Sequence, residues 1–264
     1  MTDRGKIRIG IGGWTYKPWR GSFYPDGLRQ ADELKFAAEA LTAIEINGTF
    51  YGAQKPETFA KWRASVPDGF KFSVKAPRFA VNRRVLAEAG ESIERFVAGG
   101  VTELGDALGP ILWQFAGTKQ FDADDFGKFL ELLPSAHAGA PFQHALEPRH
   151  ESFRCAEFVE MARAKGAAIV WDHDGKYPEI ADQTADFAYM RILGTSEREA
   201  LGYPDAALSG LASQLQSLAT GGEAKGVQLA SEHQSKPRDV YAFVIAGHKE
   251  VNPSAAQALI GMVG

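Results

Sequence analysis

The stretch AIEINGTF, residues 43–50, has the alternation of a β-strand whose two faces meet different surroundings. Ile44 and Ile46 share one face, because side chains two residues apart point the same way along a strand. Glu45 and Asn47 share the other face. The apolar face has to pack against helices, so we expect Glu45 and Asn47 to point to the inside of a closed parallel sheet. This strand predicts a barrel with polar side chains in its interior.

Seven further short β-like runs occur along the chain, separated by segments with helical spacing. They are residues 7–14, 70–76, 110–115, 142–149, 167–174, 187–194 and 239–246. The helical candidates are residues 29–41, 56–66, 91–108, 122–133, 151–165, 205–219 and 253–263. The link from 174 to 187 has no helical pattern, because it is short and contains Pro178.

This alternation, without a linker or a shift in composition, predicts one single (β/α)8 TIM-type barrel over residues 1–264, an α/β fold. One unit, between strands six and seven, is expected to be irregular. The alternative is an open doubly wound sheet, which usually has a glycine fingerprint between the first strand and a helix. Here Gly10, Gly12 and Gly13 lead into Trp14, so we interpret them as residues that make space at a crowded strand end rather than as a phosphate loop.

Composition excludes several classes of protein. With 45% hydrophobic and 23% charged residues, the chain is neither disordered nor fibrous. A net charge of -4 argues against bulk attraction to DNA or an anionic membrane, although it is compatible with a local basic mouth. The single cysteine, Cys155, excludes an internal disulfide and favours a small core or helix-start residue over a nucleophile. No targeting signal or membrane span is visible, so we expect a cytoplasmic protein.

The same alternation along the other strands (residue parity) predicts that further polar side chains point into the barrel. Most of them lie near the C-terminal ends of the strands, where barrel enzymes place their chemistry. These are Lys75, Gln114, Glu147, Arg149, Tyr189 and Arg191. Asp172 is ambiguous, because it shares parity with Val170 but is flanked by Trp171 and His173. Glu45, Glu147, Lys75 and Arg191 could alternatively form an ion-pair network that is purely architectural.

An aromatic cluster is expected over the same mouth, either to stack a sugar or base or to pack as a lid. It comprises Trp14, Tyr16, Trp19, Phe23, Tyr24, Phe50 and Tyr51. The histidines show no metal-binding spacing, and a site made from two histidines and carboxylates is only weakly indicated. We therefore predict no metal and no cofactor.

Five blocks of the sequence resemble, in order, the YecE-like family, domain of unknown function 72. They are residues 9–25, 45–78, 108–115, 145–150 and 187–194. The resemblance implies a barrel related in shape to endonuclease-four and the sugar isomerases, and no established activity. The positions that match the mouth residues of the family are Trp14, Tyr16, Trp19, Glu45, Asn47, Tyr51, Lys75, Glu147, Arg149, His150 and Arg191.

Two positions depart from the family pattern. Members usually carry a histidine before the glycine that follows strand seven, where this chain has Leu193. They usually also have an asparagine-rich end to strand eight, where this chain reads IAGHKE, residues 245–250. His248 would replace a lost group only if its loop folds back to the mouth.

These observations favour an enzyme that acts on a small anionic or sugar-like substrate, with Glu45 or Glu147 as general acid or base. Adjacent cations should keep both carboxylates ionised. The predicted substrate-binding residues are Trp14, Tyr16, Trp19, Asn47, Tyr51, Lys75, Gln114, Arg149, His150, Asp172 and Arg191. A nucleic-acid-binding or repair-type barrel and a non-catalytic ligand-binding barrel are the alternatives. Nucleic acid is the less favoured partner, no membrane partner is expected, and the oligomeric state is left open.

Overall fold

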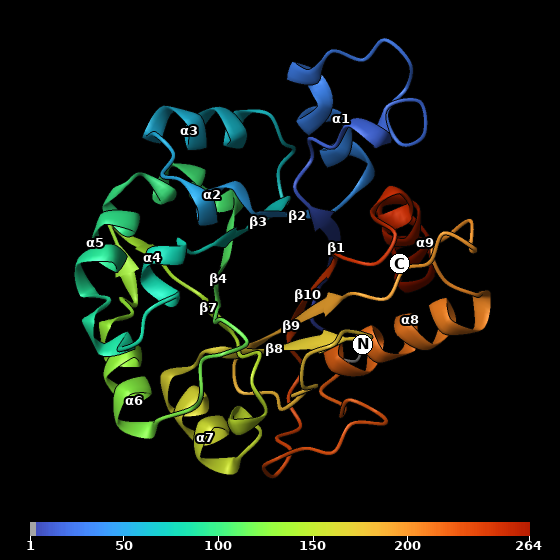
Figure 1. The fold of residues 1–264 in the computed structure, drawn as a ribbon. Coiled ribbons are helices and arrows are strands. Elements are labelled where there is room, and N and C mark those ends of the chain that lie inside the picture. The colour runs from blue at the N-terminus through green and yellow to red at the C-terminus, as the bar shows by residue number, and fades with distance from the viewer. Residues whose placement is uncertain (1–3) are drawn as a thin grey trace.

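The computed structural model describes residues 4–264 as a closed barrel of parallel strands inside a ring of helices (Figure 1). The barrel strands are β1 (Ile7–Gly12), β2 (Ala43–Ile46), β3 (Lys71–Lys75), β4 (Leu108–Gln114), β7 (His144–Glu147), β8 (Ala168–His173), β9 (Phe187–Ile192) and β10 (Asp239–Val244). Each overlaps one predicted run, and β4 begins two residues before its run. Their order around the barrel is β1-β10-β9-β8-β7-β4-β3-β2, so the chain passes once around it and the predicted TIM-type barrel is confirmed.

The helices that cover the barrel include all seven predicted segments. They are α1 (Glu33–Ala40), α3 (Pro56–Ala64), α5 (Gly90–Ala98), α6 (Ala123–Leu132), α7 (Ala156–Lys165), α8 (Asp205–Ala219) and α9 (Asn252–Val263). Two four-residue helices, α2 (Gly48–Tyr51) and α4 (Arg78–Val81), and a hairpin of β5 (Ala136–His137) and β6 (Ala140–Pro141) complete the α-helices and strands of residues 4–264, which also contain short 3-10 helices. No helix among residues 4–264 is long and apolar enough to cross a membrane.

Several predicted boundaries differ from the structure, including the following two. The helix expected over 91–108 ends at Ala98, because Gly100 has a φ of 98° and the chain continues as a 3-10 segment, Val101–Ala107. The strand expected over 43–50 ends at Ile46, and Asn47 begins α2 instead. The irregular unit is confirmed, since residues 174–186 contain neither helix nor strand.

The closed sheet separates two apolar regions. Ile44 and Ile46 pack outward with the helices, as predicted from their parity. Large rings such as Phe187, Tyr241 and Phe243 pack inside the barrel with small residues. Apolar side chains therefore fill the lumen towards the N-terminal ends of the strands, and the polar residues lie at the C-terminal ends.

The first strand needs glycine at its closest approach to its neighbour. A Cβ on Gly10 would lie 1.8 Å from the carbonyl oxygen of Ala43 on β2, and one on Gly12 would lie 3.0 Å from Cδ1 of Ile245. Gly13 has a φ of 73°, which favours glycine for conformational reasons. These contacts support the interpretation of the glycines as space-makers.

Candidate functional site

A buried ion network lies across the barrel, above the apolar part of the lumen. Arg191 Nε and Nη2 donate hydrogen bonds to the two carboxylate oxygens of Glu45 at 3.1 and 3.0 Å, and Nη1 donates to Glu147 Oε1 at 3.1 Å. Both glutamates are fully buried, and Arg191 is 2% exposed. Tyr189 also donates to Glu45, at 2.8 Å. The inward orientation predicted for these residues is correct.

Glu147 accepts hydrogen bonds from two further residues. Gln114 Nε2 lies 2.9 and 2.7 Å from its two oxygens, and Arg149 Nε lies 2.6 Å from Oε1. Burial opposes ionisation of Glu147, but the guanidinium groups of Arg191 and Arg149 outweigh it, so the pKa of this carboxyl is lowered. Glu147 is therefore a carboxylate held in place by three side chains.

Asp172 is the unusual acid of the site. Its side chain is 1% exposed, and neither carboxyl oxygen finds a hydrogen-bond partner among residues 4–264. Burial raises its pKa well above the ordinary value, and the negative charge of Glu147 raises the pKa further. Val170 beneath it packs in the lumen whereas Trp171 packs outside, which resolves the ambiguity of this strand in favour of an inward Asp172. A carboxyl whose pKa is raised thus lies near one whose pKa is lowered.

A cavity of about 710 Å³ opens above these groups at the C-terminal ends of the strands. Fifteen residues line it: Gly12, Asn47, Tyr51, Lys75, Gln114, Arg149, Asp174, Gly175, Lys176, Tyr177, Arg191, Leu193, Ile245, Ala246 and Lys249. Five of them are Lys or Arg, and only Asp174 is acidic. The mouth is therefore locally basic in a chain whose net charge is -4.

Comparison with known proteins gives the chain a family. The profile described as "Protein of unknown function DUF72" matches residues 8–264. The chain belongs to the DUF72 family. The UPF0759 protein YecE of Escherichia coli is 25% identical over 150 residues, which cover 56% of this chain and 50% of YecE. The chain thus matches about half the length of this curated relative.

Solved DUF72 structures share the fold. The chain is similar to a DUF72 family protein from Thermotoga maritima, with a TM-score of 0.72, 22% identity and 97% of each chain covered. A DUF72 family protein from Enterococcus faecalis gives a TM-score of 0.65 at 16% identity, with 98% of each chain covered. At these identities the likeness establishes the barrel, so the chemistry of the site has to come from its residues.

The DUF72 barrel brings most of the predicted site residues together. Asn47, Tyr51, Lys75, Gln114, Arg149 and Arg191 line the cavity. The two predicted catalytic residues, Glu45 and Glu147, lie one layer beneath the lining, as does Asp172.

Four predicted ligand-binding residues lie outside the lining of this cavity. Trp14 packs edge-on against Trp62 of α3, with ring centroids 5.2 Å apart. His150 Nδ1 accepts a hydrogen bond from the Ser152 backbone at the start of a 3-10 helix, Glu151–Phe153. The other two are Tyr16 and Trp19. The expectation that the whole aromatic cluster covers the mouth is therefore corrected, because most of these rings pack with the helical layer.

Aromatic rings nevertheless position two of the cations. Lys249 Nζ lies 4.4 Å from the ring centroid of Tyr16, and Trp19 Nε1 donates to the Lys249 carbonyl at 2.9 Å. The guanidinium of Arg149 lies 4.2 Å from the ring centroid of Tyr177 and donates to its hydroxyl. Such contacts hold a cation without neutralising it.

Sequence reasoning missed Asp174, Lys176, Tyr177 and Lys249 as mouth residues. All four lie within five residues after the end of β8 or β10, and the two lysines in these loops were the available signal, because barrel enzymes place their chemistry in the loops that follow the strands. The two departures from the family pattern also lie here, because Leu193, Ile245 and Ala246 give the cavity an apolar wall. His248 does not return to the cavity lining, and its ring lies 3.9 Å from Glu197 and 3.8 Å from Glu250.

Other candidates contribute no chemistry to this site. Within residues 4–264, no group of three or more His, Cys, Asp or Glu side chains is arranged to hold a metal ion. Cys155 is the half-buried N-cap residue of α7, in agreement with its predicted role at a helix start.

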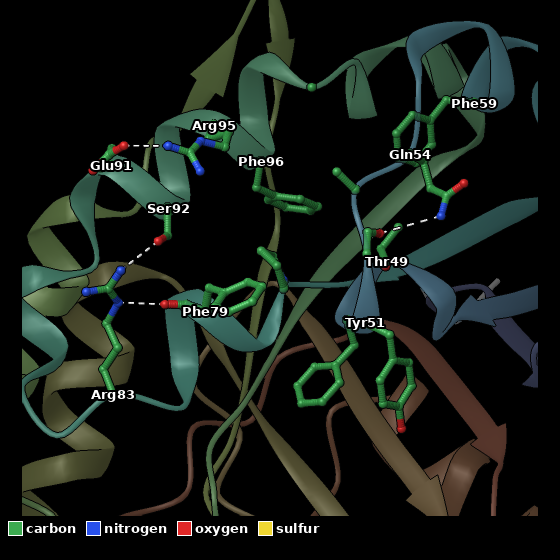
Figure 2. Close-up of a pocket in the computed structure, with 15 residues that line it drawn as sticks. Thr49, Tyr51, Gln54, Phe59, Phe79, Arg83, Glu91, Ser92, Arg95 and Phe96 are labelled. Carbon is green, nitrogen blue, oxygen red and sulfur yellow. Dashed lines mark hydrogen bonds and ion pairs between the residues drawn. The ribbon is translucent and has the colours of Figure 1, made fainter.

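A second cavity of about 380 Å³ lies between α2, α4 and α5, and shares Tyr51 with the first (Figure 2). The rings of Phe79 and Phe96 point into it, and Tyr51 at its edge is 71% exposed. Arg83 on its wall is bound to the Phe79 carbonyl and the Ser92 hydroxyl, at 2.6 and 2.8 Å. This cavity is mainly apolar, in contrast to the basic mouth.

Proposed function

We propose that this DUF72 protein is an enzyme that acts on a small anionic or sugar-like substrate at the C-terminal mouth of its barrel. The observation that carries the proposal is the charge of the cavity, where three of the five basic side chains, those of Lys75, Lys176 and Lys249, form no ion pair with residues 4–264. Phosphate and carboxylate groups are the natural partners of such a lining. A volume of about 710 Å³ suits a small metabolite.

The basic residues divide into two groups. Arg191 is occupied by Glu45 and Glu147, so its main role is to hold these carboxylates. Lys176 and Lys249 are in none of the ion pairs among residues 4–264, and both face the cavity. We therefore assign anion binding chiefly to Lys176 and Lys249, with Arg149 beside them.

Proton transfer is assigned to the carboxyl groups beneath the lining. The pKa of Glu147 is lowered, whereas that of Asp172 is raised, and neighbouring carboxyls with separated pKa values are a common acid-base arrangement. Gln114 and Arg149 contact Glu147 and also line the cavity. A substrate that binds Arg149 or Gln114 would gain access to the Glu147 carboxylate.

A thermal-shift screen over sugar phosphates, nucleotides and small carboxylates tests the binding site. Ligands that bind only the folded state raise Tm by mass action. We expect at least one compound to stabilise the wild type and the Lys225→Met control, and to lose most of this effect in the Lys176→Met/Lys249→Met variant. If no compound raises Tm, or if the double variant responds like the wild type, the assigned anion site is wrong.

The apolar wall supports a second candidate, a non-catalytic ligand-binding barrel. Leu193 and Ile245 stand where the family pattern leads us to expect polar groups, and side chains such as these cannot transfer protons. Incubation of a stabilising ligand with the wild type and with Glu147→Gln, followed by mass spectrometry of the ligand, separates the two candidates. Conversion by the wild type alone supports the enzyme, whereas recovery of unchanged ligand from both supports the binding barrel.

A further inference from the structure

Lys75 differs from Arg149 and Arg191 in the mouth because no carboxylate of residues 4–264 forms an ion pair with its amine. It is the last residue of β3, is 7% exposed and lines the cavity. Arg149 and Arg191 both form ion pairs with glutamates. Lys75 Nζ forms none with residues 4–264, and instead lies 4.4 Å from the ring centroid of Phe50. The ion network predicted from the sequence therefore forms without Lys75.

The surroundings of Lys75 favour its neutral, nucleophilic form. Burial lowers the pKa of this amine to about 8, and the nearby positive charge of Arg191 acts in the same direction. The charges of Glu45 and Glu147 raise the pKa and that of Arg149 lowers it, so the carboxylates offset the effect of burial only in part. A lysine that is desolvated beside another cation is activated as a nucleophile near neutral pH.

We propose that Lys75 forms a Schiff base with the aldehyde or ketone group of an anionic substrate. The Nζ lone pair attacks the carbonyl carbon, and a proton moves from nitrogen to the former carbonyl oxygen to give a carbinolamine. With one further proton from solvent, this oxygen leaves as water and a protonated imine remains. The step consumes the amine, the carbonyl compound and one proton, and it needs no oxidant or reductant.

This proposal rests on the proposed function for the binding of the anionic group. Lys75, Lys176 and Lys249 line one cavity, so a substrate whose phosphate or carboxylate binds the loop lysines can present its carbonyl carbon to Lys75. The substrate class is therefore a small keto acid, an aldehyde acid or an open-chain sugar phosphate. The protonated imine would attract electrons from the bond next to the former carbonyl carbon, which is the chemistry that a Schiff-base lysine provides.

Reductive trapping tests the proposal with two probes, pyridoxal 5′-phosphate followed by borohydride, and pyruvate with cyanoborohydride. Reduction converts an imine into a stable secondary amine, which peptide mass spectrometry locates. At pH 7.5 we expect Lys75 to be labelled by at least one probe at a rate about tenfold or more above that of the exposed Lys128 and Lys225, because its pKa is lower. Excess inorganic phosphate should slow the labelling of Lys75 and leave Lys225 unaffected.

The matched variants are Lys75→Arg, which keeps the charge but cannot form this imine, and Lys225→Met as the surface control. Labelling at position 75 should persist in Lys225→Met, while Lys75→Arg should lose the fast label and still be stabilised by the anionic probe without reductant. If Lys75 is labelled no faster than the surface lysines by either probe, the Schiff-base proposal is wrong. Stabilisation by the probes without preferred labelling would leave the anion site of the proposed function intact, whereas absence of both would overturn both proposals.

Discussion

Arg191 on β9 binds both carboxylate oxygens of Glu45 on β2, through Nε at 3.1 Å and Nη2 at 3.0 Å. The two strands are not neighbours in the barrel, so this bidentate contact crosses the lumen. It fixes the floor of the cavity and neutralises a fully buried carboxylate. A buried pair of this kind is costly to break, because the remaining charge has no water to solvate it.

Removal of this guanidinium should strongly destabilise the fold. We expect Arg191→Met to lower the free energy of unfolding by about 3–5 kcal/mol, since Glu45 and Glu147 both lose a buried partner. Urea denaturation at pH 7 measures the change. The control is Arg95→Met, which removes the exposed pair with Glu91 and should cost no more than about 1 kcal/mol. Equal costs for the two variants would contradict the importance assigned to the network.

Lys75 should make stability increase with pH in the alkaline range. Its pKa is about 8 in the folded protein against 10.5 in the unfolded chain, because of burial and of Arg191. Below pH 8 the folded state bears the cost of the buried charge, and this cost disappears as pH rises from 8 to 10.5. Relative to Lys75→Met, the wild type should gain about 3 kcal/mol over this window. Glu45 and Glu147 raise the pKa of Lys75, whereas Arg149 lowers it further, so parallel curves for the two proteins would show that the two carboxylates compensate its burial.

Asp172 should have the opposite pH dependence. Its pKa is raised in the folded state by burial and by Glu147, so the unfolded chain releases the proton at a lower pH than the folded protein does. Stability contributed by the protonated group is therefore lost as pH rises above 4. We expect Asp172→Asn to be at least as stable as the wild type at pH 8, with the difference shifting towards the wild type at pH 5. Urea denaturation at both pH values tests this, and a large loss in Asp172→Asn at pH 8 would mean that Asp172 is ionised and paired.

Gly10 should not tolerate even a methyl group. A Cβ there would lie 1.8 Å from the Ala43 carbonyl oxygen, which belongs to a paired strand and has no room to move. We expect Gly10→Ala to cost about 3 kcal/mol of unfolding free energy. Gly48 has no atom within 4 Å of such a Cβ and lies in α2, so Gly48→Ala should be neutral or stabilising. Thermal denaturation of both variants checks the prediction, and similar Tm values would contradict the close packing of β1 and β2.

Duplex DNA should bind weakly and without sequence preference. The net charge is -4, and the basic residues of the mouth line a cavity rather than a stripe that could follow a phosphate backbone. Fluorescence anisotropy at 150 mM salt should give a Kd no tighter than about 1 μM. Tighter, salt-sensitive binding that is lost in Arg149→Met would favour the nucleic-acid alternative instead.

The barrel and the direction of its main polar side chains could be predicted from the sequence alone. Side chains alternate along a strand with a period of two, so Ile44 and Ile46 fix the outward face and thereby place Glu45 inside. The same rule placed Glu147 and Arg191 correctly. The family resemblance supported the prediction of the barrel, because the matching blocks extend along nearly the whole chain.

Tertiary structure alone decided which of the inward groups meet. The alternation of side chains places each one on a face of the strand but does not give its partner across the lumen. The sequence therefore could not show that Arg191 binds two glutamates while Lys75 pairs with no carboxylate of residues 4–264. Nor could it show that the Asp172 carboxyl finds no hydrogen-bond partner in the described part of the chain, since this depends on the register of neighbouring strands. Loop paths likewise decided that Lys176 and Lys249 reach the cavity and that Trp14 and His150 do not. The alternation along a strand involves only neighbouring residues and can therefore be recognised in the sequence. The electrostatics of the mouth depend on strands and loops that are far apart along the chain and meet only in the folded barrel.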